Sequence, residues 1–171
     1  QDYLLGIDVG STTVKVAIMD QVGEILYSEY RRHFARIQET LAEVLRRASE
    51  KLGSVPVLPA ITGSGGMALA QAMKIPFVQE VIAVSESLDR RYPQTDVAIE
   101  LGGEDAKILY LTGGRDQRMN GVCAGGTGSF IAQMAALLGT DAEGLNEYAR
   151  NYKRIYPIAA RCGVFAKSDL Q

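Results

Sequence analysis

The stretch Leu5-Gly-Ile-Asp-Val-Gly-Ser-Thr-Thr-Val-Lys15 decides how the chain begins to fold. Its first part is apolar and ends in an acid, and a Gly-Ser-Thr-Thr turn then leads into a second run of alternating apolar residues. This pattern is typical of a β-hairpin, with strands over residues 3–8 and 13–19. A further turn at 20–23 and a strand over 24–30 extend the hairpin to a three-stranded antiparallel meander.

The turn of this hairpin, residues 10–13 and called the first turn below, also carries groups that bind phosphate. Its backbone N–H groups and hydroxyls can surround a phosphate, while Lys15 supplies a positive charge. Asp8 can hold Mg²⁺ through water, since hydrated Mg²⁺ favours one or two carboxylates together with phosphate oxygens. An ordinary hairpin with an acid at its edge fits the same residues. No Gly-Lys-Ser/Thr opens a helix here, so this is not a Walker loop.

A second turn, residues 102–105, repeats this design later in the chain. Ile99-Glu-Leu-Gly-Gly-Glu-Asp-Ala-Lys107 runs from an apolar strand through Gly-Gly and two acids into another strand. The strands expected around it cover 96–101, 106–111 and 117–120. Two such turns, about 94 residues apart, suggest two lobes that hold one phosphate chain from opposite sides, with residues 1–94 in the first lobe and 95–171 in the second. In this respect the chain resembles the actin-like ATPase superfamily of sugar kinases and heat-shock chaperone ATPases, whose RNase-H-like lobes bind ATP and Mg²⁺ between them.

Apolar residues at helical spacing predict the helices. Between Ile37 and Leu52 the apolar residues recur at offsets of three and four, which indicates one helix that ends at Gly53. The remaining elements of the first lobe are a strand over 57–61, a helix over 67–73, a brief strand over 77–79 and a helix over 81–91. Helices at about 127–138, 141–153 and 162–170 follow the second group of strands. The predicted fold class is therefore α/β, with mixed sheets and flanking helices.

Composition restricts the classes of function open to the chain. It has 171 residues and a net charge of −2, from 18 basic and 20 acidic side chains. A balance this close to neutral favours neither nucleic acid nor a membrane surface as a partner, and no apolar run approaches the ~20 residues of a spanning helix. Two cysteines are too few for a disulfide framework. We therefore expect a soluble cytoplasmic protein whose 18 glycines mark ligand loops or tight turns.

The two cysteines each lie near the start of a predicted helix. Cys123 precedes the glycine-rich run at 125–128, and Cys162 stands at the start of the helix expected over 162–170. A helix N-terminus carries partial positive charge and unpaired N–H groups, so it favours a thiolate and an anionic ligand beside it. Two thiolates are too few for a four-cysteine metal site, but a symmetric homodimer supplies four. Buried space-filling cysteines, a zinc site shared between two chains and an intrachain redox disulfide stay open as alternatives.

Five motifs carry a resemblance that covers nearly the whole chain. They are the stretch 5–15, Thr62-Gly-Ser-Gly-Gly66, Glu100-Leu-Gly-Gly-Glu-Asp-Ala-Lys107, Asn120-Gly-Val-Cys-Ala-Gly-Gly-Thr-Gly-Ser-Phe130 and Arg161-Cys-Gly-Val-Phe-Ala-Lys167. In this order, and with the separation of 39 residues between the two cysteines, the chain resembles the activators of 2-hydroxyacyl-CoA dehydratases. The same ATPase family includes the ATPase subunits of benzoyl-CoA reductase.

The resemblance implies an ATP-dependent electron donor. Family members form homodimers that share one [4Fe-4S] cluster, and they use ATP binding and hydrolysis to drive a low-potential electron into a partner dehydratase or reductase. Transferred motif by motif, Cys123 and Cys162 of each subunit ligate the cluster, and Asp8 and Asp105 hold Mg²⁺ and act in catalysis. The implied residues for ATP or ADP and the cofactor loops are Gly10, Ser11, Thr12, Thr13, Lys15, Gly102, Gly103, Glu104, Gly125, Gly126 and Thr127.

The chain departs from the family pattern in two ways. Smaller activators commonly carry Gln where this chain has Glu104, and the Glu form looks more like the activator modules of large fused proteins. The family also continues past residue 171 to finish the second lobe, so we expect an excised piece that by itself binds nucleotide weakly or not at all. Two other functions stay open: an actin-like sugar-kinase-type ATPase without a cluster, and a non-catalytic assembly or sensor module.

The single histidine, His33, follows Arg31-Arg32 at a predicted strand-to-helix junction. A solvated position suits this context better than a ligand role. We therefore expect His33 to lie at the surface and to take no part in ligand binding.

Overall fold

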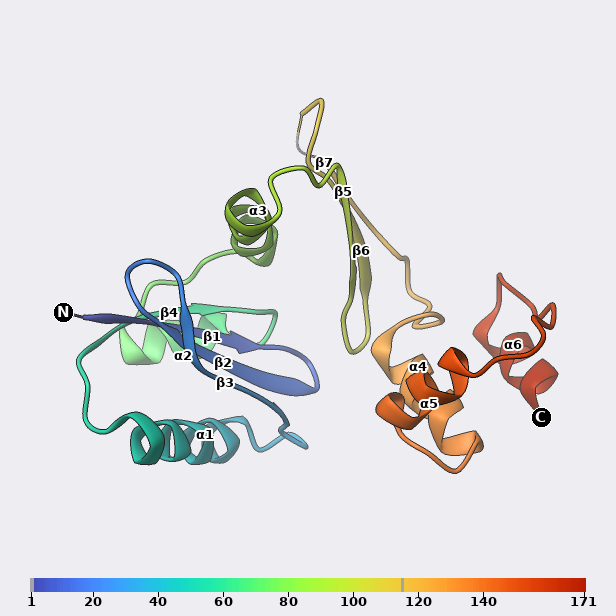
Figure 1. Ribbon diagram of the computed structural model, residues 1–171, viewed down its shortest axis with the longest axis horizontal. Helices are drawn as coiled ribbons and strands as arrows, with labels where there is room; N and C mark the ends of the chain where they lie inside the picture. The colour runs from blue at the N-terminus through green and yellow to red at the C-terminus, as the bar shows by residue number, and fades with distance from the viewer. Residues whose placement is uncertain (1, 115) are drawn as a thin grey trace. The chain divides into compact units, whose positions relative to one another are not determined.

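The structure is a computed structural model that describes residues 2–114 and 116–171. The chain forms two compact units, which divide between Thr95 and Asp96 (Figure 1). Unit 1 comprises residues 1–95 and unit 2 comprises residues 96–171. Each unit contains one of the two acid-and-glycine turns.

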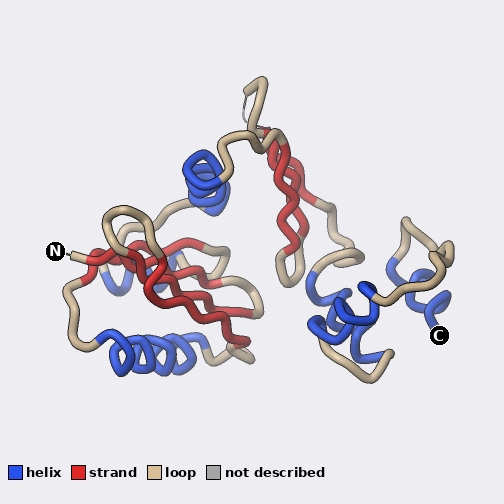
Figure 2. The backbone as a smooth tube through the Cα atoms, in the orientation of Figure 1, coloured by secondary structure: helices blue, strands red, loops and turns tan. Residues whose placement is uncertain are grey.

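Unit 1 is built on a four-stranded mixed sheet. Its strands are β1 (Tyr3–Val9), β2 (Thr13–Met19), β3 (Ile25–Arg32) and β4 (Val57–Thr62), in the order β3-β2-β1-β4. The first three strands form the expected antiparallel meander, which Figure 2 shows as adjacent strands, and β4 pairs with β1 in parallel. In this register Asp8 of β1 stands between Lys15 of β2 and Thr62 of β4.

Three helices accompany this sheet: α1 (Ile37–Leu52), α2 (Met67–Met73) and α3 (Glu80–Arg91). Helix α1 packs against β2 and β3. The side chains that share the core are Leu5, Ile7, Val9, Val14, Val16, Ile18, Leu41, Val44, Ala48, Ile61 and Ala70. Because successive strand residues point to opposite faces, burial of Ile7 and Val9 in this core places the intervening Asp8 on the opposite face.

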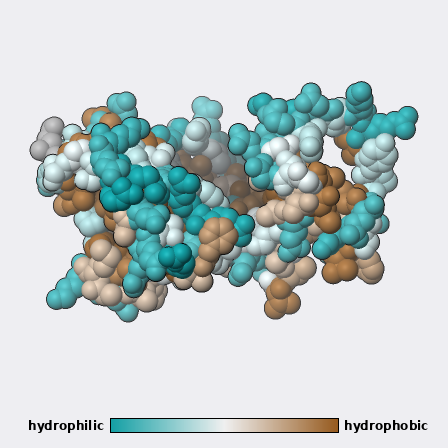
Figure 3. Space-filling model, turned by 90° about the horizontal axis from the view of Figure 1, so that it is seen from below, coloured by the Kyte–Doolittle hydropathy of each residue, from teal (hydrophilic) through white to brown (hydrophobic). Residues whose placement is uncertain are grey.

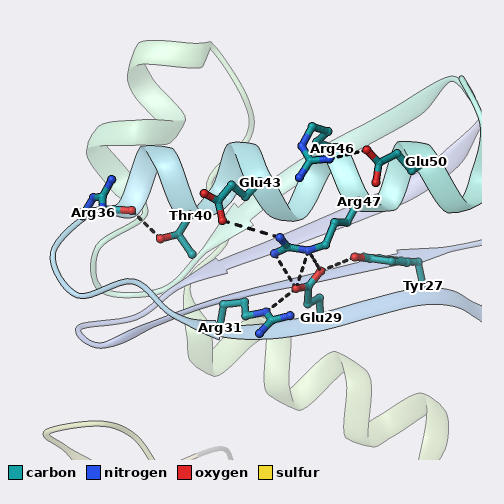
Figure 4. Close-up of polar contacts among 9 residues, drawn as sticks. All are labelled: Tyr27, Glu29, Arg31, Arg36, Thr40, Glu43, Arg46, Arg47 and Glu50. Carbon is teal, nitrogen blue, oxygen red and sulfur yellow. Dashed lines mark hydrogen bonds and ion pairs between the residues drawn. The ribbon is translucent and has the colours of Figure 1, made fainter.

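A cluster of charged side chains joins β3 to α1 (Figure 4). Glu29 accepts hydrogen bonds from Arg47 Nη2 at 2.8 Å, from Arg31 Nε at 2.6 Å and from the Tyr27 hydroxyl. The hydrogen bonds from Arg47 are the largest cause that lowers the pKa of Glu29 from 4.5 to about 2. The cluster therefore holds α1 on the sheet with charge-assisted bonds.

Unit 2 combines a three-stranded antiparallel sheet with three helices. The strands β5 (Val97–Leu101), β6 (Ala106–Tyr110) and β7 (Asp116–Met119) pair in chain order, as expected. The helices are α4 (Gly128–Leu137), α5 (Ala142–Arg150) and α6 (Gly163–Leu170), and α4 contacts both of the others. Within the described residues, no helix combines the length and the apolar character that a membrane span requires.

Two elements are shorter than the sequence suggested. The brief strand expected at 77–79 is a single bridge between Phe77 and Ile61. The helix expected to reach residue 153 ends at Arg150, where Asn151 closes it with bonds to the carbonyls of Tyr148 and Ala149. Both elements were therefore predicted longer than they are.

Candidate functional site

Asp8 lies at the end of β1 with its two carboxylate oxygens in different surroundings. Oδ2 accepts from Lys15 Nζ at 2.7 Å across the β1–β2 pair. Oδ1 is buried and has no hydrogen-bond partner among residues 2–114 and 116–171, and the same holds for Oγ1 of Thr62 on the neighbouring strand. A buried polar oxygen without a partner costs free energy, so these two oxygens suit a ligand that brings donors or positive charge.

The loop at residues 63–66 lies directly against the first turn. Gly65 N–H donates to the Val9 carbonyl at 2.9 Å. Gly63 has φ +98°, and a Cβ there would lie 2.3 Å from the Val9 oxygen and 2.5 Å from Asp8 Oδ1. Only glycine allows this approach, so the motif beginning at Thr62 helps to shape the surroundings of Asp8.

The first turn is closed by a backbone hydrogen bond and is held by contacts with His33. Gly10 N–H donates to the Thr13 carbonyl at 2.9 Å. The Gly10 carbonyl lies 3.0 Å from Nε2 of His33, and His33 N–H donates to the Thr12 carbonyl at 3.1 Å. His33 is only 5% exposed, so the expectation of a solvated histidine is wrong. The β2–β3 pairing of Thr13 with Arg32 places His33, the residue after β3, next to Thr12.

The backbone N–H groups of the first turn favour an anionic ligand. Ser11 is exposed and Thr12 partly exposed. Among residues 2–114 and 116–171, the N–H groups of Ser11 and Thr12 have no acceptor. Thr13 is buried. Free amides beside Lys15 and an orphaned Asp8 oxygen fit a nucleotide phosphate with a hydrated Mg²⁺.

A cavity of about 880 Å³ opens over this face of the unit 1 sheet. Asp8, Lys15 and Thr62 line it together with Tyr30 and with apolar side chains of α3 such as Val84. A volume of this order accommodates a cofactor-sized ligand, and mostly apolar walls with a few polar groups are usual for such sites.

The second turn has its own glycine-dependent geometry. Gly102 N–H donates to the Asp105 carbonyl at 2.8 Å, and a Cβ on Gly102 would lie 2.3 Å from Asp105 Oδ1. Asp105 Oδ2 lies 3.7 Å from Nζ of Lys107 on β6. Gly103 is partly exposed and Glu104 is exposed. Each turn thus has a carboxylate near a lysine, but Asp8 of β1 faces Lys15 across the strand pair, whereas Asp105 directly precedes β6, the strand that carries Lys107.

Helix α4 begins against the second turn. Gly128 N–H donates to the Gly102 carbonyl at 2.7 Å, and Ser129 N–H donates to the Gly103 carbonyl at 2.8 Å. Thr127 is the N-cap residue of the helix and is fully buried. The glycines of the second turn and the glycine-rich run before α4 therefore form one connected structure.

The two cysteine-bearing loops lie side by side in unit 2. Cys123 is exposed and accepts from Gly125 N–H at 3.4 Å, while Cys162 is partly exposed and is the N-cap residue of α6. A Cβ on Gly163 would lie 3.3 Å from Cα of Gly125, so the two loops are in contact. Gly126, with φ +82°, has open space around it.

Within the described residues, no three His, Cys, Asp or Glu side chains gather where they could hold a metal ion. Two accessible free thiols on touching loops nevertheless fit one half of a four-thiolate site. An N–H group that already donates to Cys123 Sγ is the kind of bond that stabilises thiolate ligands of a cluster.

Asn120 is a site residue that the sequence indicates only as part of a motif. Its Oδ1 accepts from Ala106 N–H at 2.9 Å, and its Nδ2 donates to the Cys123 carbonyl at 2.7 Å. The side chain therefore connects the strand that leaves the second turn with the loop that carries Cys123. An asparagine three residues before a cysteine, at the end of a predicted strand, was the signal available for this bridge.

A mixed sheet with a β-β-β-α-β start, flanking helices and two acid-and-glycine turns defines an α/β fold of the actin-like ATPase type. The sequence matches the BadF/BadG/BcrA/BcrD ATPase family over residues 5–171, and the chain belongs to that family. It is 32% identical to the 2-hydroxyisocaproyl-CoA dehydratase activator of Clostridioides difficile, covering 98% of this chain and 64% of that protein. It is 30% identical to the (R)-2-hydroxyglutaryl-CoA dehydratase activating ATPase of Acidaminococcus fermentans, covering 98% of this chain and 66% of that protein.

A solved structure supports the same assignment. The activator of the 2-hydroxyisocaproyl-CoA dehydratase from Clostridium difficile, with bound ADPNP, superimposes with a TM-score of 0.83 at 28% identity. The match covers 98% of this chain and 63% of that structure. The chain thus spans about two thirds of the length of the curated relatives it matches. The resemblance to dehydratase activators and the expected fold class are both confirmed.

Proposed function

We propose that this chain carries the nucleotide-binding and cluster-binding parts of an ATP-dependent activator. In this proposal ATP and Mg²⁺ bind at the two turns, and two copies of the chain share one [4Fe-4S] cluster through Cys123 and Cys162. The bound cluster would supply a low-potential electron to a dehydratase-like or reductase-like partner in the cytoplasm. Membership of an ATPase family and similarity to two dehydratase activators support this function.

The observation that carries the proposal is the network of bonds between the second turn and Cys123. The turn accepts two backbone hydrogen bonds from the start of α4, and the Asn120 side chain joins Ala106 to the Cys123 carbonyl. A movement of the second turn must therefore break these bonds or displace the segment 120–129. Hydrogen bonding and solvent access at the sulfurs set the potential of an iron–sulfur site, so nucleotide state can reach the thiols along this path.

The first turn supplies the other half of the nucleotide chemistry. Lys15 already balances one oxygen of Asp8, and the second oxygen, buried and without a partner among the described residues, would be satisfied by the positive charge of a hydrated Mg²⁺. The amides of Ser11 and Thr12, which have no acceptor among the described residues, would then hold phosphate oxygens in place. These groups position and stabilise charge, which is the main contribution a protein makes to phosphoryl transfer.

Anaerobic reconstitution of the full chain with iron and sulfide tests the cluster. We expect about four irons per dimer, visible absorption of a [4Fe-4S] centre, and loss of both in Cys123→Ala and in Cys162→Ala. Ser168→Ala on α6 is the matched control, because it changes the helix that Cys162 caps without removing a thiol. Absence of iron from the unmodified chain would contradict the proposal. ATP hydrolysis without iron would instead favour a sugar-kinase-type ATPase, and neither property would favour a non-catalytic module.

Substitution of Asp8 tests the nucleotide site separately. Asp8→Asn keeps the shape of the side chain but removes the charge that pairs with Lys15 and faces Mg²⁺. We expect ATP hydrolysis to fall by roughly 100-fold or more, with iron content unchanged. Asp2→Asn, an exposed acid beside β1, serves as the control. Hydrolysis by Asp8→Asn at the rate of this control would contradict the assignment.

A further inference from the structure

The single histidine of the chain is buried beneath the first turn, and we propose that it is the positioning residue of that turn for phosphate. His33 follows directly after β3 and contacts the turn at two points. Its ring meets the Gly10 carbonyl and its backbone N–H donates to the Thr12 carbonyl. This inference rests on the phosphate role proposed above for residues 10–13.

The contacts of the ring define its protonation. Ala35 N–H donates to Nδ1 at 3.0 Å, so Nδ1 carries no proton. Nε2 must then carry the proton of the neutral ring, and it donates to the Gly10 carbonyl at 3.0 Å. Both ring nitrogens are therefore used, one as an acceptor and one as a donor.

The bond to the Gly10 carbonyl fixes the direction of the next amide. The peptide group between Gly10 and Ser11 is planar and trans, so its C=O and N–H point in opposite directions. Because the Gly10 carbonyl is bonded to the buried ring of His33, the Ser11 N–H points in the opposite direction, away from the interior of unit 1. That amide has no acceptor within the described parts of the chain, which leaves it available to an anion.

The junction after His33 holds the ring in place. Phe34 and Ala35 have φ of 47° and 63°, a conformation that costs a non-glycine residue free energy. Arg36 N–H donates to the His33 carbonyl at 2.7 Å just before α1 begins. A strained pair of residues persists only where its surroundings determine it, and the bonds from Ala35 N–H to Nδ1 and from Arg36 N–H to the His33 carbonyl are such surroundings.

The first experiment separates positioning from simple packing. In the full chain, His33→Ala removes both ring contacts, whereas His33→Gln retains an N–H donor that can reach the Gly10 carbonyl. Tyr27→Phe is the control, because it removes one hydrogen bond from β3 far from the turn. We expect the Kd for Mg-ATP to rise about 10-fold or more in His33→Ala, to recover in part in His33→Gln, and to stay unchanged in Tyr27→Phe. Equal ATP affinity in His33→Ala and the control would overturn the proposal.

A second measurement does not depend on nucleotide binding. Because the chain has one histidine, its ¹⁵N imidazole signals need no assignment, and the shifts distinguish a proton on Nε2 from one on Nδ1. We expect the Nε2–H form in the folded chain; the Nδ1–H form would overturn the proposed bond to Gly10. The tautomer decides whether His33 holds the turn even where ATP binding by the unmodified chain is too weak to measure, so a failure of this inference is distinguishable from a failure of the function proposed above.

Discussion

The two turns share a sequence design but are held by different parts of the molecule. The first turn lies inside a packed unit, between the glycine loop that follows β4 and the buried His33. The second turn is held by the start of α4, the helix that follows the Cys123 loop. The first turn is therefore held by the glycine loop and the buried histidine of unit 1. The second turn is hydrogen-bonded to the segment that follows Cys123.

The two units that contain the turns also differ in how many apolar side chains they bury. The apolar core cluster of unit 1 includes side chains from the sheet and from α1 and α2. In unit 2 fewer apolar side chains are buried, and several near the cysteines are largely exposed, among them Val122, Val164 and Phe165. Figure 3 shows apolar side chains at the surface of the helical part of unit 2. The first turn thus belongs to the unit with the larger buried apolar core, and fewer buried side chains oppose local opening in the unit that contains the second turn.

Gly63→Ala is expected to have the largest effect on this comparison. The new Cβ would meet the Val9 carbonyl at 2.3 Å and Asp8 Oδ1 at 2.5 Å, so the loop must leave the first turn. We expect unit 1 to lose roughly 3–5 kcal/mol of stability or to fail to fold. Gly23→Ala is the matched control, because its φ of +91° is similar and nothing lies within 4 Å.

Urea unfolding followed by circular dichroism measures both variants. The control should lose only about 1 kcal/mol, the cost of a Cβ at positive φ. A Gly63→Ala chain as stable as Gly23→Ala would show that the loop at 63–66 does not brace the first turn.

Asn120→Asp is the corresponding test of the second turn. Aspartate can still accept from Ala106 N–H, but it cannot donate to the Cys123 carbonyl, and the facing acceptors then repel. We expect unit 2 to lose about 1–2 kcal/mol. After reconstitution, ATP should change the visible absorption of the iron–sulfur centre less than in the unmodified chain. Gln117→Ala, an exposed residue of β7, is the control, and an undiminished response to ATP in Asn120→Asp would rule out coupling through this side chain.

Local patterns predicted most of the elements. The strand Thr13–Met19 and the helix Met67–Met73 have the expected limits, because alternation, helical periodicity and glycines at element ends are properties of short segments. The glycines of both turns were recognised for the same reason. The brief strand at 77–79 is reduced to one bridge, since pairing at a sheet edge depends on a partner that the segment itself does not reveal.

His33 and Asn120, whose contacts no local pattern predicts, bond to residues that are far away along the chain. His33 reaches a carbonyl 23 positions earlier, and Asn120 joins two segments that are 17 residues apart, from Ala106 to Cys123. The predicted strand over 24–30 ended before Arg32, and the register shift between Ile18 and Met19 was not predicted, so the pairing of Thr13 with Arg32 that places His33 next to Thr12 could not be inferred. Periodicity identifies which residues are buried, but only the strand register identifies what they contact.

A smaller change in stability, confined to unit 1, is expected on substitution of Glu29. Its pKa is lowered to about 2, chiefly by the hydrogen bonds from Arg47, so the folded state favours the charged form. The stabilisation is complete above pH 4.5, the pKa without these partners, and it disappears as the pH falls toward about 2. Glu29→Gln should cost about 1–2 kcal/mol at pH 7 and should flatten the loss of stability between these pH values.

Thermal unfolding at a series of pH values measures this effect. Glu50→Gln is the control, since Glu50 pairs with Arg46 on the exposed face of α1 and exposed pairs contribute little. Acid sensitivity of Glu29→Gln equal to that of the unmodified chain would show that the cluster in Figure 4 does not bind α1 to the sheet.

The smallest expected effect is a gain, at the junction that holds His33. Ala35 has φ 63°, so Ala35→Gly removes the Cβ that opposes this conformation but adds freedom to the unfolded chain. The relief of backbone strain is slightly larger than the cost of the added freedom in the unfolded chain. We therefore expect about 0.5 kcal/mol more stability in urea unfolding, with ATP affinity unchanged. If His33 holds the first turn because the bonds of its ring are favourable, relief of the strain beside it leaves the turn intact. If instead the strain presses the ring against Gly10, Ala35→Gly should weaken ATP binding as His33→Ala does, and the measured affinity separates the two causes.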